Sequence, residues 1–531
     1  MNKSRAWKDP RTSDGDDDNG RFSKDYNDIT NMTWSNILTY QTKIKKKHNL
    51  DLLAGYEINS KESDGLGTTI SNFARWDKPE VNNGVVYQSM GGSNSTTRIV
   101  SYITRANYDY DNKYYLGASW RTDGSSRLAR ENRWGNFWSL SGAWRVSSES
   151  FMKPLQNWLS DLKLRVSYGV NGTLPSSYYG YMGLSSLTSN YNDNPGITQS
   201  QLENKELTWE TNYNFNSGID LGFFDNRLNV TFEYYVRTTK NLLYSRPLSL
   251  ATGFSSYLAN IGKLQNKGYE LEIRSTNIET KDFRWSTSLN LGHNANKILK
   301  LDGDLKQVTS GTSIHKVGLP YSTYYMIEFA GIDPADGEPM FYKNTTDENG
   351  NLNKETTKDP RSAEKVILQC ADPTITGGLG NSISYKWFDL NFNVNFSFGA
   401  WNYDGAAGKL EHGGDGTLNI PIYYRKRWQK EGDETSIERF VVGRSISMTD
   451  YATTRRLYSG DYVRLKNLTF GFTLPKTWTR KVGIDNIRLY ASGNNLLTWA
   501  AYDYIDPESG SSPSWDTPPM RTYTFGLEVK F

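Results

Sequence analysis

The stretch that decides the fold is RTYTFGLEVKF, residues 521–531. Tyr523, Phe525, Leu527, Val529 and Phe531 alternate with small or polar residues along it. Because side chains of a β-strand point alternately to opposite faces, the stretch is predicted to be a strand with one apolar face and one hydrated face. A soluble protein rarely ends on such a strand without covering it. A bacterial outer-membrane β-barrel does end in this way, because its last strand completes the wall.

The composition permits a membrane barrel and excludes a bundle of membrane helices. Only 36% of the 531 residues are hydrophobic, and the mean hydropathy is -0.68. No stretch offers the roughly 20 uninterrupted apolar residues that a membrane helix needs, whereas in a barrel wall only alternate residues face lipid. Aromatic residues make up 14% of the chain. They suit the girdles at both membrane interfaces, although a soluble carbohydrate-binding β protein can be equally aromatic.

The same alternation recurs along the chain. In residues 390–398 the apolar residues are separated by Asn391, Asn393, Asn395 and Ser397. Asn, Ser, Thr and Tyr outnumber Lys and Glu on such polar faces, which suits a hydrated interior better than an open protein surface. The pattern predicts about fifteen strands, near 34–44, 49–59, 98–110, 113–121, 136–147, 161–170, 207–222, 228–237, 264–276, 284–292, 374–385, 388–398, 461–473, 487–497 and 521–531.

The connections between these strands alternate between short and long. Tight turns are expected at 111–113, 224–227 and 386–387, with one helical turn in 148–160. Short turns on one side and long loops on the other are typical of an outer-membrane barrel. The predicted fold class is therefore all-β, an antiparallel transmembrane β-barrel. The long polar connections lie near 60–97, 171–206, 238–263, 293–373, 399–460 and 498–520.

Charge, cysteine content and the N-terminal residues narrow the function classes. The net charge of +3 over 531 residues is too small to predict a nucleic-acid partner. Cys370 is the single cysteine, so no internal disulfide is possible. Residues 1–20, MNKSRAWKDPRTSDGDDDNG, contain no apolar segment of a signal peptide. An exported protein needs such a signal, so the natural start is expected to be missing from this chain.

Several segments resemble the SusC/RagA-type TonB-dependent transporters of Bacteroidota outer membranes. They follow the order of that family from about residue 98 to the end of the chain. The segments are YLGASWRTDGSSR (115–127), RWGNFWSLSGAWRVSSESFM (133–152), WLSDLKLRVSYGVNG (158–172), NIGKLQNKGYELEI (260–273), SGDYVRLKNLTFGFTLP (459–475), LYASGNNLLTWAAYDYIDPE (489–508) and RTYTFGLEVKF (521–531).

The resemblance implies a wall of about 22 strands around an N-terminal plug. It also implies import of glycans or peptides across the outer membrane, driven by TonB-ExbB-ExbD in the full-length protein. A SusD/RagB-like surface lipoprotein is the implied partner, and outer-membrane lipid surrounds the wall. No cofactor is implied.

Members of that family are about twice as long as this chain, which shows no TonB box, plug or early strands. We therefore expect a C-terminal barrel portion, with about 15 strands of the wall. Residues 1–33 are predicted to be a polar extracellular loop, and 34–531 the barrel with a long extracellular excursion at 293–373. Strand 34–44 would then run toward the periplasm and Phe531 would lie there. Strands 34–44 and 521–531 should each lack one neighbour.

No catalytic or cofactor site stands out. His48, His293, His315 and His412 are scattered without metal-ligand spacing. Gly377, Gly378 and Gly380 lack the lysine and helix of a phosphate loop, so they are interpreted as strand glycines. Glu270 and Glu272 share one face of a strand and are interpreted as neighbouring carboxylates of the barrel interior rather than a glycosidase pair.

The acidic N-terminal stretch contains one candidate metal site. Asp14, Asp16, Asp18 and Asp25 approximate an EF-hand loop, with Asn19 in place of its glycine. The alternatives are calcium bound in an extracellular loop and a solvated acidic loop.

Substrate contacts are expected from aromatic and amide side chains near the outer rim. Sugars stack on aromatic faces and hydrogen-bond to carboxylates and amides. Trp401, Tyr403, Asp404, Tyr423 and Tyr424 fit this description, with loop packing as the alternative role for each.

Three function classes remain on the sequence alone. The chain is predicted to be part of a nutrient importer. The two alternatives are a soluble all-β glycan-binding or adhesion protein and a β-rich hydrolase. A lipid-facing band should make the importer depend on detergent, whereas a glycosidase would need a functional carboxylate pair.

Overall fold

The computed structural model describes residues 1–192, 194–301, 305–347, 350–414, 419–443, 451–479, 481, 483–502, 504–509 and 519–531. The chain divides into two compact units. The first unit comprises 1–143, 167–214 and 239–261, and the second comprises 144–166, 215–238 and 262–531.

Most of the described chain is antiparallel β-structure, and the largest sheet has 16 strands in chain order. Each of the strands expected from alternation corresponds to one strand of this sheet, which confirms the all-β fold class. The strands are β1 (Asn2–Lys8), β2 (Arg21–Ile44), β3 (His48–Phe73), β4 (Gly84–Tyr110), β5 (Tyr114–Ser125), β6 (Trp134–Arg145), β7 (Leu159–Thr173), β10 (Glu210–Phe223), β11 (Leu228–Lys240), β14 (Lys263–Glu279), β15 (Phe283–Lys300), β23 (Ile375–Tyr385), β24 (Phe388–Phe398), β27 (Tyr462–Thr473), β28 (Asn486–Ala500) and β29 (Thr522–Lys530).

The first unit contains three very long strands, and here the sequence prediction was wrong. β2, β3 and β4 have 24, 26 and 27 residues, against the roughly 9–11 that cross a bilayer. Residues 1–33 are therefore not a loop, because they contain β1 and the first half of β2. Likewise, most of the expected link at 60–97 is strand, paired from His48 with Tyr110 to Phe73 with Gly84. Residues 21–33 of β2, 60–73 of β3 and 84–97 of β4 carry polar residues on both faces of the sheet. The sequence therefore shows no alternation in these segments.

β1 adds one short strand at the start of the sheet and pairs with residues 21–27 of β2. Residues 34–44 of β2 pair with β3 alone in the described structure, as expected for the first predicted strand. Among the described strands, β29 likewise has β28 as its single neighbour.

The short turns between strands use left-handed backbone conformations. Asp111 and Asn112 have φ of 53° and 54° and belong to the three-residue connection between the paired residues Tyr110 and Tyr114, in which the Lys113 amide donates to the Tyr110 carbonyl at 2.9 Å. Phe224, Asp225 and Asn226 are also left-handed. The tight turns expected at these positions are confirmed, and the helical turn expected in 148–160 is a short 3-10 helix, η3 (Ser150–Leu155).

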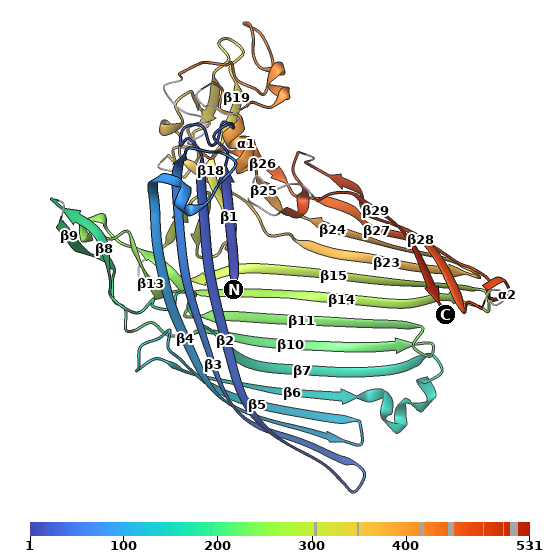
Figure 1. Cartoon of the computed structure of the whole chain (residues 1–531). Helices are drawn as coiled ribbons and strands as arrows, with labels where there is room; N and C mark the ends of the chain where they lie inside the picture. Colours follow the sequence, from blue (N-terminus) through green and yellow to red (C-terminus); the bar gives the residue numbers. More distant parts are fainter. Residues whose placement is uncertain are drawn as a thin grey trace. The chain divides into compact units, whose positions relative to one another are not determined.

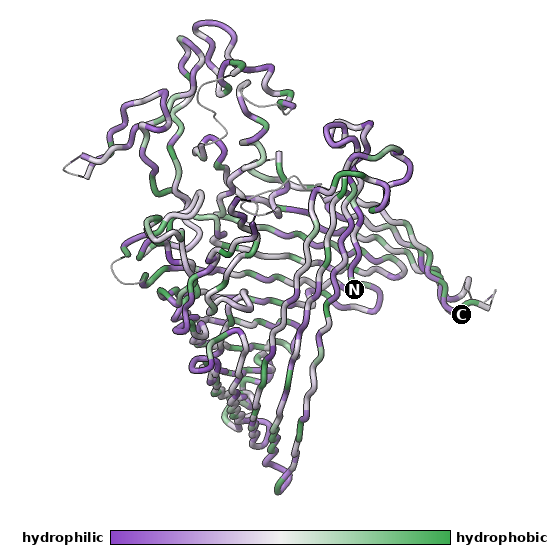
Figure 2. The backbone as a smooth tube through the Cα atoms, turned by 60° about the vertical axis from the view of Figure 1, so that its left-hand side comes forward, coloured by the Kyte–Doolittle hydropathy of each residue, from purple (hydrophilic) through white to green (hydrophobic). Residues whose placement is uncertain are grey.

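In the second unit, β14, β15, β23, β24, β27, β28 and β29 run side by side (Figure 1). Directly opposed residues of neighbouring strands share a face of the sheet. Leu379 lies opposite Leu289 and Val394, whereas Gly378 lies opposite Asn290 and Asn395. Apolar and polar residues therefore form separate faces, and Figure 2 shows the corresponding alternation of green and purple along the strands.

The excursion after β15 is folded rather than irregular. Its four-stranded sheet packs Tyr324 and Met326 against Leu457 in a buried cluster. The short strands outside the main sheet are β8 (Leu184–Tyr191), β9 (Asn194–Gln201), β12 (Leu243–Pro247), β13 (Ser256–Asn260), β16 (Gln307–Ser310), β17 (Ser313–Lys316), β18 (Thr323–Ile327), β19 (Phe329–Ile332), β20 (Pro339–Tyr342), β21 (Thr356–Thr357), β22 (Lys365–Cys370), β25 (Trp401–Tyr403) and β26 (Leu457–Ser459).

Among the described residues, helices are few and short. The α-helices are α1 (Gly405–Leu410) and α2 (Lys476–Thr479), and the other 3-10 helices are η1 (Val81–Asn83), η2 (Val146–Ser148), η4 (Leu250–Thr252), η5 (Pro360–Ser362), η6 (Ile422–Lys426), η7 (Thr454–Arg456) and η9 (Pro507–Ser509). In the described part of the chain, no helix is long and apolar enough to cross a membrane.

An arginine is predicted to have different effects on folding at two neighbouring positions of β24, because their side chains lie on opposite faces of the sheet. Val394→Arg places a cation on the apolar face, where it should cost about 2–4 kcal/mol at the middle of a bilayer. Asn393→Arg places it on the polar face and should be tolerated. The folded fraction recovered in lipid vesicles measures the difference, and equal recovery of the two variants would contradict the assignment of the faces.

Candidate functional site

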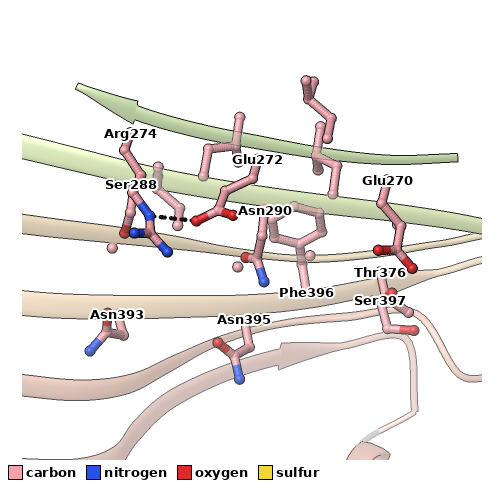
Figure 3. A pocket seen from close by; sticks show the side chains of 18 of the residues that line it. Glu270, Glu272, Arg274, Ser288, Asn290, Thr376, Asn393, Asn395, Phe396 and Ser397 are labelled. Carbon is pink, nitrogen blue, oxygen red and sulfur yellow. Dashed lines mark ion pairs between the residues drawn. The ribbon is translucent and has the colours of Figure 1, made fainter. Parts of the chain in front are cut away.

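A polar cavity of about 1030 Å³ lies on the second unit's sheet (Figure 3). Opposed pairs place Glu270 beside Gly292, Glu272 beside Asn290, and Asn290 beside Gly378. The polar face of β14, β15, β23 and β24 therefore supplies most of the side chains shown in Figure 3. The polar lining residues are Thr231, Glu233, Glu270, Glu272, Arg274, Ser288, Asn290, Thr376, Asn393, Asn395, Ser397 and Tyr462.

Two of the three carboxylates that line the cavity are held by neighbouring cations and amides. Glu272 forms an ion pair with Arg274, and Glu233 forms one with Arg165 and accepts a hydrogen bond from Asn216 at 3.1 Å. The expected common face of Glu270 and Glu272 is confirmed by the register. A carboxylate held in this way can exchange hydrogen bonds with polar groups.

Glycines make room for the side chains of the polar face. A Cβ on Gly378 would lie 2.7 Å from Oδ1 of Asn290, and one on Gly380 would lie 2.6 Å from Oγ of Ser288. Both glycines belong to β23, as does Gly377. The interpretation of these residues as strand glycines is confirmed, and their lack of side chains leaves the amides of the neighbouring strands exposed to the cavity.

The five residues expected to contact substrate lie in loops of the second unit, and three of them are engaged in packing. Trp401 and Tyr403 of β25 pack against the cluster around Tyr324 and Met326. Asp404 is 4% exposed. It caps α1 by accepting a hydrogen bond from the Ala407 amide at 2.7 Å, and it accepts another from the Tyr502 hydroxyl at 3.0 Å. These contacts match loop packing, the alternative role that the sequence left open.

The remaining two candidates, Tyr423 and Tyr424, belong to η6 and each donates a hydrogen bond to a carboxylate. The Tyr424 hydroxyl is buried and lies 2.7 Å from Oε1 of Glu438. The half-buried Tyr423 donates to Oε1 of Glu411 at 2.5 Å. Tyr423 is thus the candidate with the more accessible ring.

Both carboxylates belong to a buried ionic cluster of Glu411, Glu438, Arg455 and Arg456. Arg455 pairs with Glu438 and lies 3.6 Å from Oε2 of Glu411, and Arg456 Nε lies 3.2 Å from the same oxygen. Glu438 is fully buried. Two carboxylates thus meet two guanidinium groups, and because removal from water is costly for single charges, this pairing is needed for the cluster to be stable.

The ionisation of the ionic cluster follows from these contacts. Burial alone would raise the pKa of Glu438, but the charge of Arg455 and the Tyr424 hydroxyl more than offset it, so this pKa lies below its ordinary value. Burial and the charge of Glu438 raise the pKa of Tyr424. The carboxylate therefore stays ionised and the phenol stays a hydrogen-bond donor, which fixes the loop around η6.

Sequence reasoning missed Tyr504, which completes a group of tyrosines. Tyr458 and Tyr502 stack with ring centroids 3.8 Å apart, and Tyr504 lies 5.3 Å from Tyr502 and 5.6 Å from Tyr423. Tyr504 is 69% exposed. The only sequence signal was its place in the aromatic run WAAYDY of the long link near 498–520.

The acidic N-terminal stretch does not assemble a metal site in the described residues. The Thr12 hydroxyl donates to Asp14 at 2.6 Å, the Ser4 hydroxyl donates to Asp25 at 3.0 Å, and Arg21 lies 3.6 Å from Asp18. Within the described ranges, no three histidine, cysteine or acidic side chains are grouped to hold a metal ion. Asp14, Asp16 and Asp18 lie between β1 and β2, whereas Asp25 lies within β2, so the four carboxylates do not belong to one loop.

Comparison with known proteins links the whole chain to one family. The family model described as TonB dependent receptor-like, beta-barrel matches residues 2–496. TonB-dependent receptor P3 of Formosa agariphila is 33% identical over 96% of this chain and 53% of its own length. TonB-dependent receptor SusC of Bacteroides thetaiotaomicron is 30% identical over 82% of this chain and 44% of its own.

A solved structure agrees with these sequence relatives. The structure of the RagAB peptide transporter superposes with a TM-score of 0.84 and 28% identity, covering 96% of this chain and 56% of the other. The chain thus spans about half the length of the relatives that it matches.

The ionic cluster predicts a large effect from removing one cation. Arg455→Met leaves Glu438 buried without its partner, and such losses typically cost about 3–5 kcal/mol. We expect faster hydrogen exchange across residues 404–414 and 419–443. Arg361→Met is the matched control, because its ion pair with Asp359 is exposed and exposed ion pairs contribute little to stability. Equal effects of the two variants would contradict the role of the ionic cluster.

The pH dependence of hydrogen exchange gives a second test of the ionic cluster. The lowered pKa of Glu438 means that its stabilisation is fully present above the ordinary value of 4.5 and is lost as the pH falls below it. Exchange in this loop should therefore accelerate in acid, and Glu438→Gln should weaken that pH dependence.

Proposed function

The chain belongs to the family of TonB-dependent receptor-like β-barrels, and from that premise we propose that it forms the C-terminal part of a SusC/RagA-type importer of the outer membrane. The observation that carries this proposal is the separation of an apolar from a polar face along neighbouring strands. An outer-membrane wall requires one lipid-facing and one hydrated face. The relatives are receptors rather than enzymes, and they give no support to a soluble binding protein or a hydrolase.

The polar face is proposed to line the hydrated interior through which a nutrient passes. Its cavity presents amides, hydroxyls and paired carboxylates, and these groups exchange hydrogen bonds with water and with polar solutes. A glycan or a peptide would meet suitable partners along such a surface. The apolar face is proposed to contact outer-membrane lipid.

The partners and the energy source are proposed from the relatives. A SusD/RagB-like surface lipoprotein would act with the complete barrel, and TonB-ExbB-ExbD would drive the cycle through a plug. The structural neighbour is described as a peptide transporter, so peptides stand beside glycans as the proposed cargo. Residues 293–373 are proposed to lie on the extracellular side and Phe531 on the periplasmic side.

Tyr423 and Tyr504 are proposed as the aromatic contacts for cargo at the outer rim. Their ring centroids lie 5.6 Å apart, and the exposed Tyr504 can stack with a sugar ring or an aromatic side chain. Trp401, Tyr403, Asp404 and Tyr424 are proposed to support this site by packing the loops behind it.

Transport by the complete barrel tests the function. Residues 1–531 alone should give no uptake in a strain without the native transporter, because they match a family model of the β-barrel and cover about half of the relatives' length. Joining a signal, plug and early strands from a full-length relative should restore uptake that depends on TonB. Substrate-specific, TonB-dependent growth from residues 1–531 alone would contradict the proposal.

Loss of a proposed aromatic contact should reduce uptake without reducing the yield of folded protein. In the restored transporter, Tyr504→Ala should reduce the initial rate of uptake several-fold, since stacking on an aromatic ring contributes about 0.5–1.5 kcal/mol, and it should leave the yield of folded barrel unchanged. Tyr424→Ala should instead loosen the loop, because it removes a buried hydrogen bond to Glu438. A Tyr504→Ala protein with unchanged uptake of every tested cargo would exclude this contact.

A further inference from the structure

Arg464 is a buried cation on the polar face of the large sheet. β27 places it opposite Asn395 of β24 and opposite Thr498 of β28. Directly opposed residues share a face of the sheet, and Asn395 belongs to the polar face that lines the cavity. The side chain of Arg464, which is 2% exposed, therefore points to the polar face.

The carboxylates that neutralise Arg464 come from the connection after β28. Its Nη2 donates to Oδ2 of Asp506 at 2.6 Å, its Nη1 donates to Oε2 of Glu508 at 2.7 Å, and its Nε donates to Oγ1 of Thr498 at 3.0 Å. A guanidinium is a rigid fork that can hold several acceptors at fixed angles. Residues 504–509, here called the strap, are therefore held over the polar face rather than away from the sheet.

Asp506 connects this ion pair to the backbone of the strap. Its second carboxylate oxygen, Oδ1, accepts a hydrogen bond from the Glu508 amide at 2.9 Å, and its carbonyl accepts one from the Ser509 amide at 3.0 Å. Lys466 adds a second cation 2.6 Å from Oε2 of Glu508. Two carboxylates thus meet two cations, and the position of Arg464 fixes where the short helix η9 lies.

The strap lies at the end of the polar cavity nearest the long connections. Tyr462 lines the cavity, and its ring centroid is 5.9 Å from Cζ of Arg464. Ser397, which lies opposite Tyr462 and also lines the cavity, is the last residue but one of β24. Tyr504 at the start of the strap is 69% exposed. A solute that enters the cavity from this end meets the strap and its exposed ring.

We propose that Arg464 is the positioning residue that holds Tyr504 at this entrance to the cavity. The inference rests on the proposed function, in which Tyr504 contacts cargo. Arg464 itself does not touch cargo, because it is buried and its three donating nitrogens are engaged by Thr498, Asp506 and Glu508. Loss of Arg464 frees the strap, so Tyr504 leaves the position in which it contacts cargo. Cargo is then bound more weakly, while the later steps of transport are unchanged.

A second ion pair of the large sheet provides the comparison. Arg488 of β28 donates to Asp389 of β24 at 2.7 Å, so this pair joins two strands and holds no part of the strap. Arg488→Met therefore removes an ion pair of the same kind without freeing the strap. It separates the positioning role of Arg464 from a general effect of losing a paired charge.

Hydrogen exchange in the restored transporter, purified in detergent, tests the positioning of the strap. Arg464→Met should accelerate exchange at the amides of Glu508 and Ser509 about tenfold or more, because opening of the strap exposes both. Arg464→Lys keeps the charge but not the fork, so a smaller acceleration is expected. Arg488→Met should leave both amides unchanged. Unchanged exchange after Arg464→Met, or equal acceleration by Arg488→Met, would overturn the proposal.

Asp506→Ala makes the same test without leaving Arg464 unpaired, because Glu508 and Thr498 remain its partners. It keeps the test decisive if Arg464→Met lowers the yield of folded barrel. Exchange at the Ser509 amide should again accelerate, since the strap has lost one of its two attachments to Arg464. Unchanged exchange at that amide would overturn the proposal.

Uptake then shows whether the strap acts through Tyr504. Arg464→Met should raise the KM for cargo about three- to tenfold, the range expected for one stacking contact, with the maximal rate within about twofold of the parent. In a protein that already carries Tyr504→Ala, Arg464→Met should raise KM no further, because both changes remove the same interaction. Additive effects on KM, or a fall in the maximal rate alone, would overturn the proposal. An unchanged KM after Tyr504→Ala alone would contradict the proposed cargo contact itself, and is thereby distinguished from a failure of the strap.

Discussion

The need to pair every backbone amide and carbonyl within a membrane is the constraint on which this structure depends. Hydrocarbon offers no substitute hydrogen bonds, so a strand can cross it only between two neighbouring strands. In the large sheet, the strands from β3 to β28 have a neighbour on each side in chain order, whereas β29 and most of β2 have one neighbour in the described structure. Once the backbone is paired, the period of two along each strand assigns alternate side chains to lipid and to water.

The loops meet a different constraint, because they must hold their shape without a membrane or a large apolar core around them. The ionic cluster does this for the segment around η6. Glu411, Glu438, Arg455 and Arg456 balance two negative with two positive charges in a buried position. Such a group adds less stability than an apolar core of the same size, but loss of any member leaves a buried charge unpaired. The loop is therefore expected to keep one conformation, in which Tyr423 and Tyr504 remain accessible.

The sequence was sufficient to predict the strands wherever one face was apolar and the other polar. β24 and β29 were placed almost to the residue, because Leu390 to Phe398 and Tyr523 to Val529 keep a strict alternation. Residues 21–33 of β2, 60–73 of β3 and 84–97 of β4 were missed because polar residues occur on both faces there and the sequence shows no alternation. The partners of Tyr424 could not be predicted, since Glu438 and Arg455 meet through the folding of a long loop rather than through any local spacing.

The central claim is that each strand of the large sheet has one face in lipid and one in water. Spin labels on single cysteines along residues 390–398, in a protein with Cys370 replaced by serine, measure this most directly through collisions with oxygen and with a water-soluble nickel complex. The account predicts that oxygen accessibility peaks at Leu390, Phe392, Val394 and Phe396, and that nickel accessibility peaks at Asn391, Asn393 and Asn395. Equal accessibility of both groups, or a period other than two, would contradict it.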